Sequence, residues 1–152
     1  MTPASIRASV VAERIAWIRE MISAVNALPL ESYDEFRQDP RNAASAESYL
    51  RRGIEALLDL GRHILAKGFA VAATEYKEIG VKLAVAGALS QDQADLPRKI
   101  AWYRSRMVYS YSEVTAEELY ALSTQNIGDL GRIPGALVDW LRSNPDRLDQ
   151  DI

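Results

Sequence analysis

The sequence has no cysteine and a single histidine, His63, among its 152 residues. Without cysteine the chain can form no disulfide, no thiolate metal site and no cysteine nucleophile. One imidazole leaves no partner for a histidine-based zinc site or for a catalytic pair of histidines. We therefore expect neither a metal nor a cofactor.

The sequence also lacks a long apolar run and a strong excess of charge. No segment reaches about 18 consecutive apolar residues, the length that a membrane-spanning helix needs. Charged residues such as Arg7 and Arg14 interrupt the apolar positions near the N-terminus, which is unlike a signal peptide. Eighteen basic and 21 acidic residues give a net charge of −3, so the whole chain is no polycation. We expect one cytoplasmic domain spanning residues 1–152, with no membrane contact and no DNA partner.

Apolar residues recur at helical intervals along almost the whole chain. In the first helix they step by three and four from Ile15 onward. Thr2 is expected to cap this helix, Pro3 to occupy its first position, and the helix to end near Leu28. Residues 29–44 are expected to be mostly linker, with one helical turn at residues 32–36.

The middle of the chain predicts a longer helix. Asp39-Pro40 is expected to break the chain, and a second helix to run from about Ser45 to Lys67. Gly68 is a candidate for the glycine that follows a helix C-terminus. Thr74 is expected to cap a third helix.

Two capping boxes mark the last predicted helices. Ser90 with Gln93 opens the fourth helix, and Thr115 with Glu118 opens the fifth. Pro134 is expected to kink or divide the fifth helix. Strand-like alternation is almost absent, so we expect an all-α, up-and-down bundle of about five helices. A short polar tail is expected from about residue 143.

Motifs of nucleotide and hydrolase sites are missing as well. The sequence has no phosphate-binding glycine loop and no nucleophile elbow. Paired carboxylates such as Glu117-Glu118 lie at a predicted helix start, where a solvated role is expected. A carboxylate metal site needs several convergent acids, so catalysis by a bound metal is disfavoured.

The stretch from 97 to 130 combines basic and aromatic residues. Its first part holds four basic residues and no acid within nine positions: Arg98, Lys99, Arg104 and Arg106. Aromatic residues lie among and just after them: Trp102, Tyr103, Tyr109 and Tyr111. Guanidinium groups bind phosphate and aromatic faces stack on bases, so the pattern is compatible with nucleic-acid binding, although such charge runs are more often mere surface. The alternative is a solvated helix face with aromatic residues in the core.

The same stretch resembles a motif of a known family. Residues 103–115 read Y-R-S-R-M-V-Y-S-Y-S-E-V-T. They are similar to the run R-F-R-N-R-L-V-H-x-Y-W-E-V-D of the HepT-like branch of the HEPN superfamily. Glu118-Leu119-Tyr120 and Gly128-Asp129-Leu130 follow, as a Leu-Tyr pair and an acidic-Leu ending do in the family. Similar segments precede the motif, and the resemblance covers roughly residues 5–141.

The resemblance implies a HEPN-like helical toxin that acts beside a minimal nucleotidyltransferase antitoxin of the MntA type. Such toxins resemble homodimeric, metal-independent endoribonucleases with paired motifs. In the family pattern R-x4-H-x-Y, the arginine holds the scissile phosphate and the histidine transfers a proton. Arg104 takes the arginine position. Arg98, Lys99 and Arg106 are candidates for further RNA contacts.

Two positions depart from the family's sequence, and one of them is the histidine of that pattern. Tyr109 stands where the family has histidine, and Ser105 stands where it has asparagine or aspartate. An imidazole has a pKa of about 6.5 and a phenol about 10, so a phenol is a poor base at neutral pH. General acid–base catalysis contributes about 10²–10⁴-fold, most of which this replacement should remove. The catalytic candidates are therefore Arg104 and Tyr109, in a ribonuclease that is impaired or inactive. A natural replacement and one introduced to permit expression of a toxin both fit the sequence.

Helix phase decides whether these residues can meet. Arg104 and Tyr111 are seven positions apart and share a face if the helix continues that far. A helix end near residues 108–111 would let Arg104, Tyr109 and Tyr111 converge. His63 lies four residues after Asp59, and we expect that pair to be structural or interfacial. A catalytic His63 beside Arg104 is the alternative.

Tyr111 has a second role by resemblance. The motif tyrosine of the family resembles a target for AMP transfer by the partner nucleotidyltransferase. An AMP group there would add bulk and negative charge beside Arg104 and compete with RNA phosphate. Two functions stay open: an RNase-type toxin subunit, or a non-catalytic HEPN module that binds RNA, a nucleotide or a nucleotidyltransferase.

Overall fold

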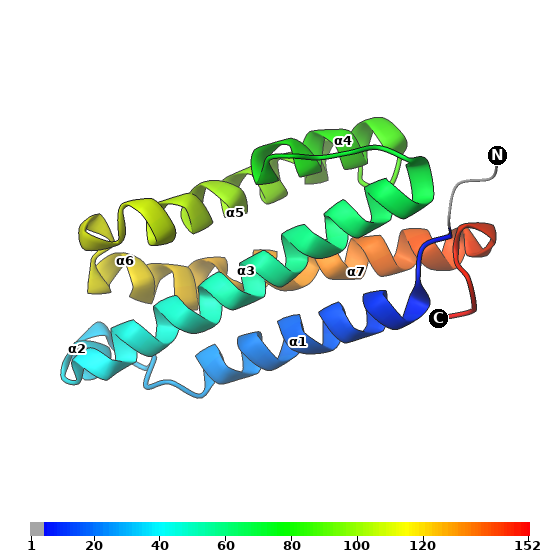
Figure 1. The fold of residues 1–152 in the computed structure, drawn as a ribbon. Helices are drawn as coiled ribbons and strands as arrows, with labels where there is room; N and C mark the ends of the chain where they lie inside the picture. Colours follow the sequence, from blue (N-terminus) through cyan, green and yellow to red (C-terminus); the bar gives the residue numbers. More distant parts are fainter. Residues whose placement is uncertain (1–4) are drawn as a thin grey trace.

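The computed structural model describes residues 5–152, and these form an elongated helical bundle (Figure 1). The α-helices are α1 (Ala8–Asn26), α2 (Tyr33–Arg37), α3 (Pro40–Phe69), α4 (Ile79–Ala86), α5 (Gln91–Tyr109), α6 (Ala116–Ala121) and α7 (Ile127–Ser143). The long helices run up and down the bundle, α4 lies along α5 at one end, and α2 and α6 lie at the other (Figure 1). The expected all-α bundle is confirmed.

The first helix begins later than the sequence predicts. Residues 5–7 are not helical, and α1 starts at Ala8. The expected cap, Thr2, and the expected first residue, Pro3, lie outside the described residues. Ile6 is fully buried and forms an isolated bridge with Leu148 instead of extending the helix.

The long helix α3 extends beyond the predicted range at both ends. Asp39 is its N-cap and accepts a hydrogen bond from the backbone N–H of Arg41 at 2.9 Å, so the helix begins at Pro40. The predicted linker is therefore wrong for residues 40–44, although a helical turn does form at α2. Gly68 lies inside the helix because its bare Cα packs on Ile6, where a Cβ would meet Cδ1 at 2.7 Å.

The end of α3 is formed by a residue other than glycine. Ala70 takes the left-handed conformation, with φ of 54°. Thr74 caps no helix: the chain enters a 3-10 turn, η1 (Tyr76–Glu78), and runs directly into α4. Both predictions for this region, Gly68 as terminating residue and Thr74 as cap, are wrong.

The predicted capping box of α5 is present. The Ser90 hydroxyl accepts from the Gln93 N–H at 3.2 Å, and the Gln93 side chain accepts from the Ser90 N–H at 2.9 Å. At α6 only half of the box forms. Thr115 caps the helix, but the Glu118 carboxylate pairs with Arg106 instead of returning to the cap.

The last helical region is interrupted at a different place from the one predicted. A π-helical segment, Leu122–Asn126, separates α6 from α7. Pro134 lies within α7 and does not divide it. Ser123 is buried in the π-helical segment, where its hydroxyl donates to the Leu119 carbonyl at 2.8 Å. Such segments break the regular helical ladder, and here this occurs without proline.

The polar C-terminal segment packs against the bundle. After the 3-10 turn Pro145–Arg147, Leu148 is buried beside Ile6. The Asp149 carboxylate accepts from the backbone N–H of Ala8 at 2.9 Å and so caps α1 from the far end of the chain. The segment expected as a short polar tail from about residue 143 therefore contributes to the packing of the bundle.

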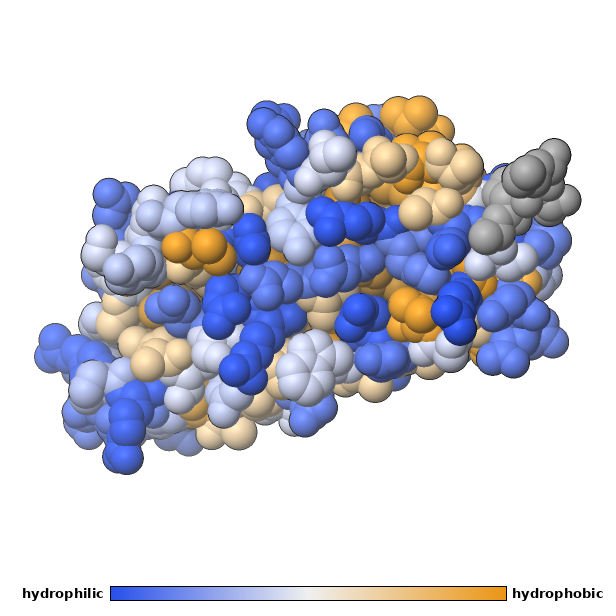
Figure 2. All heavy atoms as spheres, in the orientation of Figure 1, coloured by the Kyte–Doolittle hydropathy of each residue, from blue (hydrophilic) through white to orange (hydrophobic). Residues whose placement is uncertain are grey.

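The surface is mainly hydrophilic in the view of Figure 2, with apolar atoms gathered over α4. Val81 and Val85 on α4 and Trp102 on α5 are exposed apolar side chains. Within residues 5–152 no helix has both the length and the apolar character needed to cross a bilayer.

Candidate nucleic-acid interface

An open groove of about 690 Å³ lies where the C-terminal half of α3, the turn η1 and α5 meet. Four basic side chains and one carboxylate line it: Arg62, Lys77, Arg98, Arg104 and Glu75. Three aromatic residues complete the lining relevant to recognition: Tyr76, Trp102 and Tyr109. The groove therefore concentrates positive charge in a chain whose net charge is −3. It is suited to an anion that carries aromatic groups.

Arg104 is the arginine of the motif, and it is held in place from two sides. Its Nε donates to Oε1 of Glu55 on α3 at 3.3 Å. Its guanidinium carbon lies 4.9 Å from the centre of the Tyr76 ring. The side chain is 22% exposed, so it is partly sheltered and still reaches the groove.

Tyr76 lines the groove and contacts a second arginine. The guanidinium carbon of Arg62 is 4.7 Å from the ring centre. The Tyr76 hydroxyl donates to Oδ1 of Asp59 at 3.3 Å. Burial, followed by the negative charge of Asp59, raises the pKa of Tyr76 above that of a free phenol. The ring therefore stays neutral at physiological pH.

The two motif tyrosines lie differently. Tyr109 is the last residue of α5, lines the groove and is 76% exposed. Ser110 ends the helix, with φ of −129° and ψ of 36°, and Tyr111 opens the 3-10 turn Tyr111–Glu113. Tyr111 is 68% exposed and is not among the residues that line the groove. The helix end thus brings Arg104 and Tyr109 to one groove but leaves Tyr111 outside it.

Only part of the predicted basic cluster faces the groove. Arg98 and Arg104 line it. Arg106 forms an ion pair with Glu118 and stacks on Trp102, with 5.1 Å between its guanidinium carbon and the ring centre. Lys99 lines a different, small cavity. The helix phase separates residues that the sequence places side by side.

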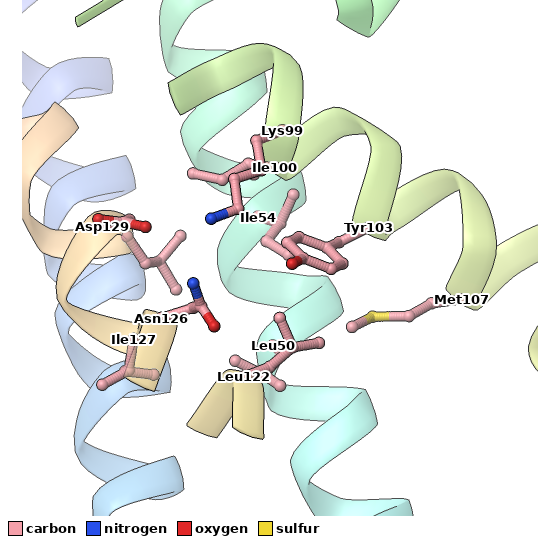
Figure 3. A pocket seen from close by; sticks show the side chains of 11 residues that line it. Leu50, Ile54, Lys99, Ile100, Tyr103, Met107, Leu122, Asn126, Ile127 and Asp129 are labelled. Carbon is pink, nitrogen blue, oxygen red and sulfur yellow. The ribbon is translucent and has the colours of Figure 1, made fainter. Parts of the chain in front are cut away.

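That small cavity lies among α3, α5, the π-helical segment and α7 (Figure 3). It offers about 30 Å³ and is lined mainly by apolar side chains. Tyr103 and Asn126 point into it from facing elements (Figure 3). A space of this size with polar groups suits a buried water rather than a substrate.

His63 lies beside Arg7, next to the start of α1, and does not line the groove. Its Nε2 accepts a hydrogen bond from the backbone N–H of Arg7 at 3.1 Å. Burial, and then the positive charges of Lys67, Arg7 and Arg14, lower the pKa of His63 below that of a free imidazole. The expected partner, Asp59, instead contacts Arg62 and Tyr76. The expected pairing of His63 with Asp59 is wrong, and the hydrogen bond that His63 forms is to the backbone of Arg7.

Between Ser5 and Ile152, no three side chains of the His, Cys, Asp or Glu type converge as a metal site would require. The groove itself contains one carboxylate and no imidazole. Its chemistry is that of anion binding by guanidinium groups, with phenols as the nearest proton donors.

Comparison with the sequence profiles of known families shows which family this chain belongs to. Residues 12–137 match the profile of the family described as ribonuclease HepT-like. This chain belongs to the HepT-like family. The groove of this HepT-like chain lies within the matched region and contains both Arg104 and Tyr109. A search of the curated proteins found no match.

Several solved structures share the fold of this chain. One is a toxin–antitoxin crystal structure with AMP-PNP, with a TM-score of 0.76 and 19% identity over 84% of this chain and 97% of the other. Another is a tri-AMPylated Shewanella oneidensis HEPN toxin in complex with MNT antitoxin, with a TM-score of 0.76 and 20% identity over 84% and 96%. A third is YutE, a Bacillus subtilis cytosolic protein of unknown function, with a TM-score of 0.74 and 18% identity over 90% and 91%.

The structure adds two residues to the site that sequence reasoning missed, Arg62 and Tyr76. Arg62 follows Asp59 by three positions, a spacing that predicts an ion pair but not a groove. Tyr76 lies in a short turn with no helical periodicity of its own. The contact of Tyr76 with Arg104 comes from the packing of α5 beside η1, which no local pattern encodes.

Proposed function

We propose that this HepT-like chain is the toxin subunit of a toxin–antitoxin pair and that it binds RNA in the groove around Arg104. The observation that carries the proposal is the groove itself. It gathers four basic side chains and three aromatic rings on a chain of net negative charge. RNA phosphates would meet guanidinium groups there, and bases would meet aromatic faces.

Within this groove Arg104 and Arg98 would contact phosphate. Arg106 is engaged by Glu118, and Lys99 faces the small cavity, so we expect both to contribute less to RNA affinity. Trp102 is 55% exposed at the groove and offers a face for a base.

Cleavage of the bound RNA would be impaired or absent. The groove offers Tyr109 where the family pattern has histidine, and His63 uses its Nε2 on the backbone of Arg7. A phenol loses its proton near pH 10 in water and so is a weak base at neutral pH. Tyr109 could still donate a hydrogen bond to a phosphate oxygen.

The partner would be an MntA-like nucleotidyltransferase antitoxin, with Tyr111 as the acceptor of AMP. Two of the structurally similar proteins are a toxin–antitoxin pair and a tri-AMPylated HEPN toxin with its antitoxin. The exposure of Tyr111 in a turn after α5 supports its access to such an enzyme. AMP on Tyr111 would add negative charge close to the groove and weaken RNA binding. The exposed side chains of Val81 and Val85 on α4 would offer an apolar surface for a homodimer.

RNA binding tests the proposal directly. Fluorescence anisotropy of labelled single-stranded RNA should show binding that weakens with salt, because phosphate contacts release counterions. Arg104→Gln should lower affinity about tenfold, while Arg106→Gln, two positions along the same helix, should lower it much less. If Arg104→Gln bound RNA as tightly as the unmodified chain does, the proposal that the groove binds RNA would be contradicted.

Modification by the partner has a separate test. Incubation with the nucleotidyltransferase and ATP, followed by mass spectrometry, should place AMP on Tyr111. Tyr111→Phe should lose it, and Tyr109→Phe should keep it. Binding of the partner without any RNA affinity would favour the second function, a non-catalytic HEPN module.

A further inference from the structure

Two arginines from different helices stack on one ring in the groove. Arg62 on α3 and Arg104 on α5 both place their guanidinium carbons within 5 Å of the Tyr76 ring centre, at 4.7 and 4.9 Å. Stacking on an aromatic face keeps a guanidinium group planar to the ring and leaves its edge free for hydrogen bonds. The ring therefore fixes two cationic groups without using their donors.

Each of the two arginines is anchored through the same atom. Nε of Arg62 donates to the carbonyl of Ala73 at 3.1 Å, and Nε of Arg104 donates to Glu55 at 3.3 Å. Among the residues from 5 to 152, no hydrogen bond engages the terminal nitrogens of either arginine; the nearest carboxylate contact is Arg62 Nη1 to Asp59 at 3.7 Å. The terminal nitrogens form the fork that binds a phosphate. Neither fork donates a hydrogen bond within the described residues, and that of Arg62 faces Asp59 at ion-pair distance only, so both can still donate to a ligand.

We propose that Arg62 is a second phosphate-contacting arginine of this groove and that Tyr76 is the positioning residue that orients Arg62 and Arg104 together. The inference rests on the proposed function, since it assumes that RNA occupies the groove. It assigns Arg62 to a phosphate other than the one at Arg104, because each arginine has its own anchor and its own free fork. The ligand class is therefore a strand with several phosphates rather than a mononucleotide.

Charge inside the groove supports an oligonucleotide. Arg98 and Lys77 add two further cations to the lining, and Glu75 is the one carboxylate, paired with Lys77 at 3.1 Å. A single phosphate could contact only part of this lining, which extends from Arg62 and Lys77 to Arg98 and Arg104. Successive phosphates of one strand could pair with them along the groove.

The salt dependence of binding separates a phosphate contact from a structural role. Each phosphate contact on a single strand contributes about 0.7 to the slope of log affinity against log salt. We would measure binding of a labelled RNA of about 12 nucleotides, within the site sizes of single-strand binders, to Arg62→Gln and to Arg52→Gln. Arg52 is exposed on the same helix and outside the groove, so it is a matched control.

We expect Arg62→Gln to lower the slope by about 0.7 and Arg52→Gln to leave it unchanged. Tyr76→Phe keeps the ring and should preserve the slope, whereas Tyr76→Ala should lower it by about twice as much because both arginines lose their support. Circular dichroism and urea unfolding establish that each variant is folded. If Tyr76→Ala does not fold, the comparison of Arg62→Gln with Arg52→Gln decides the question.

Failure of this inference differs from failure of the proposed function. If Arg104→Gln reduces the slope but Arg62→Gln behaves as Arg52→Gln does, Arg62 touches no phosphate and the inference is overturned. If Arg104→Gln also leaves affinity and slope unchanged, the groove does not bind RNA and the proposed function falls with it.

Discussion

The Nε atom of Arg104 donates a hydrogen bond to Oε1 of Glu55 at 3.3 Å, so the arginine of the motif already faces a carboxylate. That carboxylate orients the guanidinium group, and it also lowers the positive potential that a phosphate would meet. Glu55 is shared, because Arg51 approaches the same oxygen at 3.7 Å. A substitution of Glu55 that removes its charge but keeps a hydrogen-bond acceptor tells these two effects apart.

Glu55→Gln should raise RNA affinity at low salt. The amide oxygen keeps an acceptor for Arg104 while the opposing charge is removed. Surface ion pairs are worth about 0.2–1 kcal/mol, and this one is partly sheltered, so the gain should be on the order of fivefold. Fluorescence anisotropy at low and high salt measures it, and the gain should shrink as salt rises. Weaker binding by this variant would mean that the Glu55 charge helps to build the site.

His63 predicts a pH dependence of stability. Its pKa is lowered in the folded chain by burial and neighbouring cations, and its Nε2 must be unprotonated to accept from Arg7. The unfolded chain therefore binds this proton at a higher pH than the folded chain does. The free energy of unfolding should be fully retained above about pH 6.5 and should fall as the pH drops through the lower, folded-state pKa.

Urea unfolding between about pH 5 and 7.5, around the imidazole pKa of about 6.5, checks this. His63 is the only histidine, so His63→Gln should flatten the part of the profile next to neutral pH. The same slope in the variant would assign the effect to other groups.

The contact between α4 and α5 depends on a glycine. A Cβ on Gly80 would lie 2.5 Å from the backbone oxygen of Ala94, which cannot move aside as a flexible side chain could. Gly80→Ala should destabilise the fold by about 1–3 kcal/mol through overpacking. Because α4 directly follows the turn that carries Tyr76, this variant should also weaken RNA binding.

Gly135 is the matched control for that substitution. Nothing lies within 4 Å of a Cβ at this position, which is exposed on α7. Gly135→Ala should stabilise the chain by about 0.5–1 kcal/mol, because alanine loses less conformational entropy in a helix. Thermal unfolding of both variants should show shifts of opposite sign. Shifts of the same sign would contradict the close packing of α4 on α5.

The sequence predicted the helices better than the way they meet. The Ser90–Gln93 capping box was predictable because its partners lie three positions apart. The arrangement at Tyr76 was not, since its partners Asp59, Arg62 and Arg104 lie on two other helices. The site was therefore only half predictable: Arg104 and Tyr109 from a motif, Arg62 and Tyr76 from tertiary packing alone.

The ends of the chain likewise depend on long-range contacts that the local sequence does not predict. Local propensity placed the start of α1 at Pro3, but the start at Ala8 is fixed by a carboxylate 141 positions away, Asp149. A polar C-terminal segment gives no sign that it caps a helix. Gly68 likewise suggested a helix end, whereas the absence of a side chain there lets Ile6 pack closely against α3.

Asp149→Ala should therefore destabilise the fold. The loss of a capping carboxylate costs about 0.5–2 kcal/mol. Asp151→Ala, an exposed carboxylate two positions along, should change the free energy of unfolding by much less. Urea unfolding at pH 7 compares the two. Equal effects would show that Asp149 acts only through net charge.

RNA cleavage by the unmodified chain, beside its Tyr109→His variant and with Arg104→Ala as the blank, tests the central claim most directly. The account predicts that only Tyr109→His cuts RNA, because the groove supplies Arg104 for the phosphate and holds Tyr109 where the family pattern has histidine. Cleavage by the unmodified chain that disappears in Arg104→Ala would contradict it, since Tyr109 would then serve as a competent proton-transfer residue.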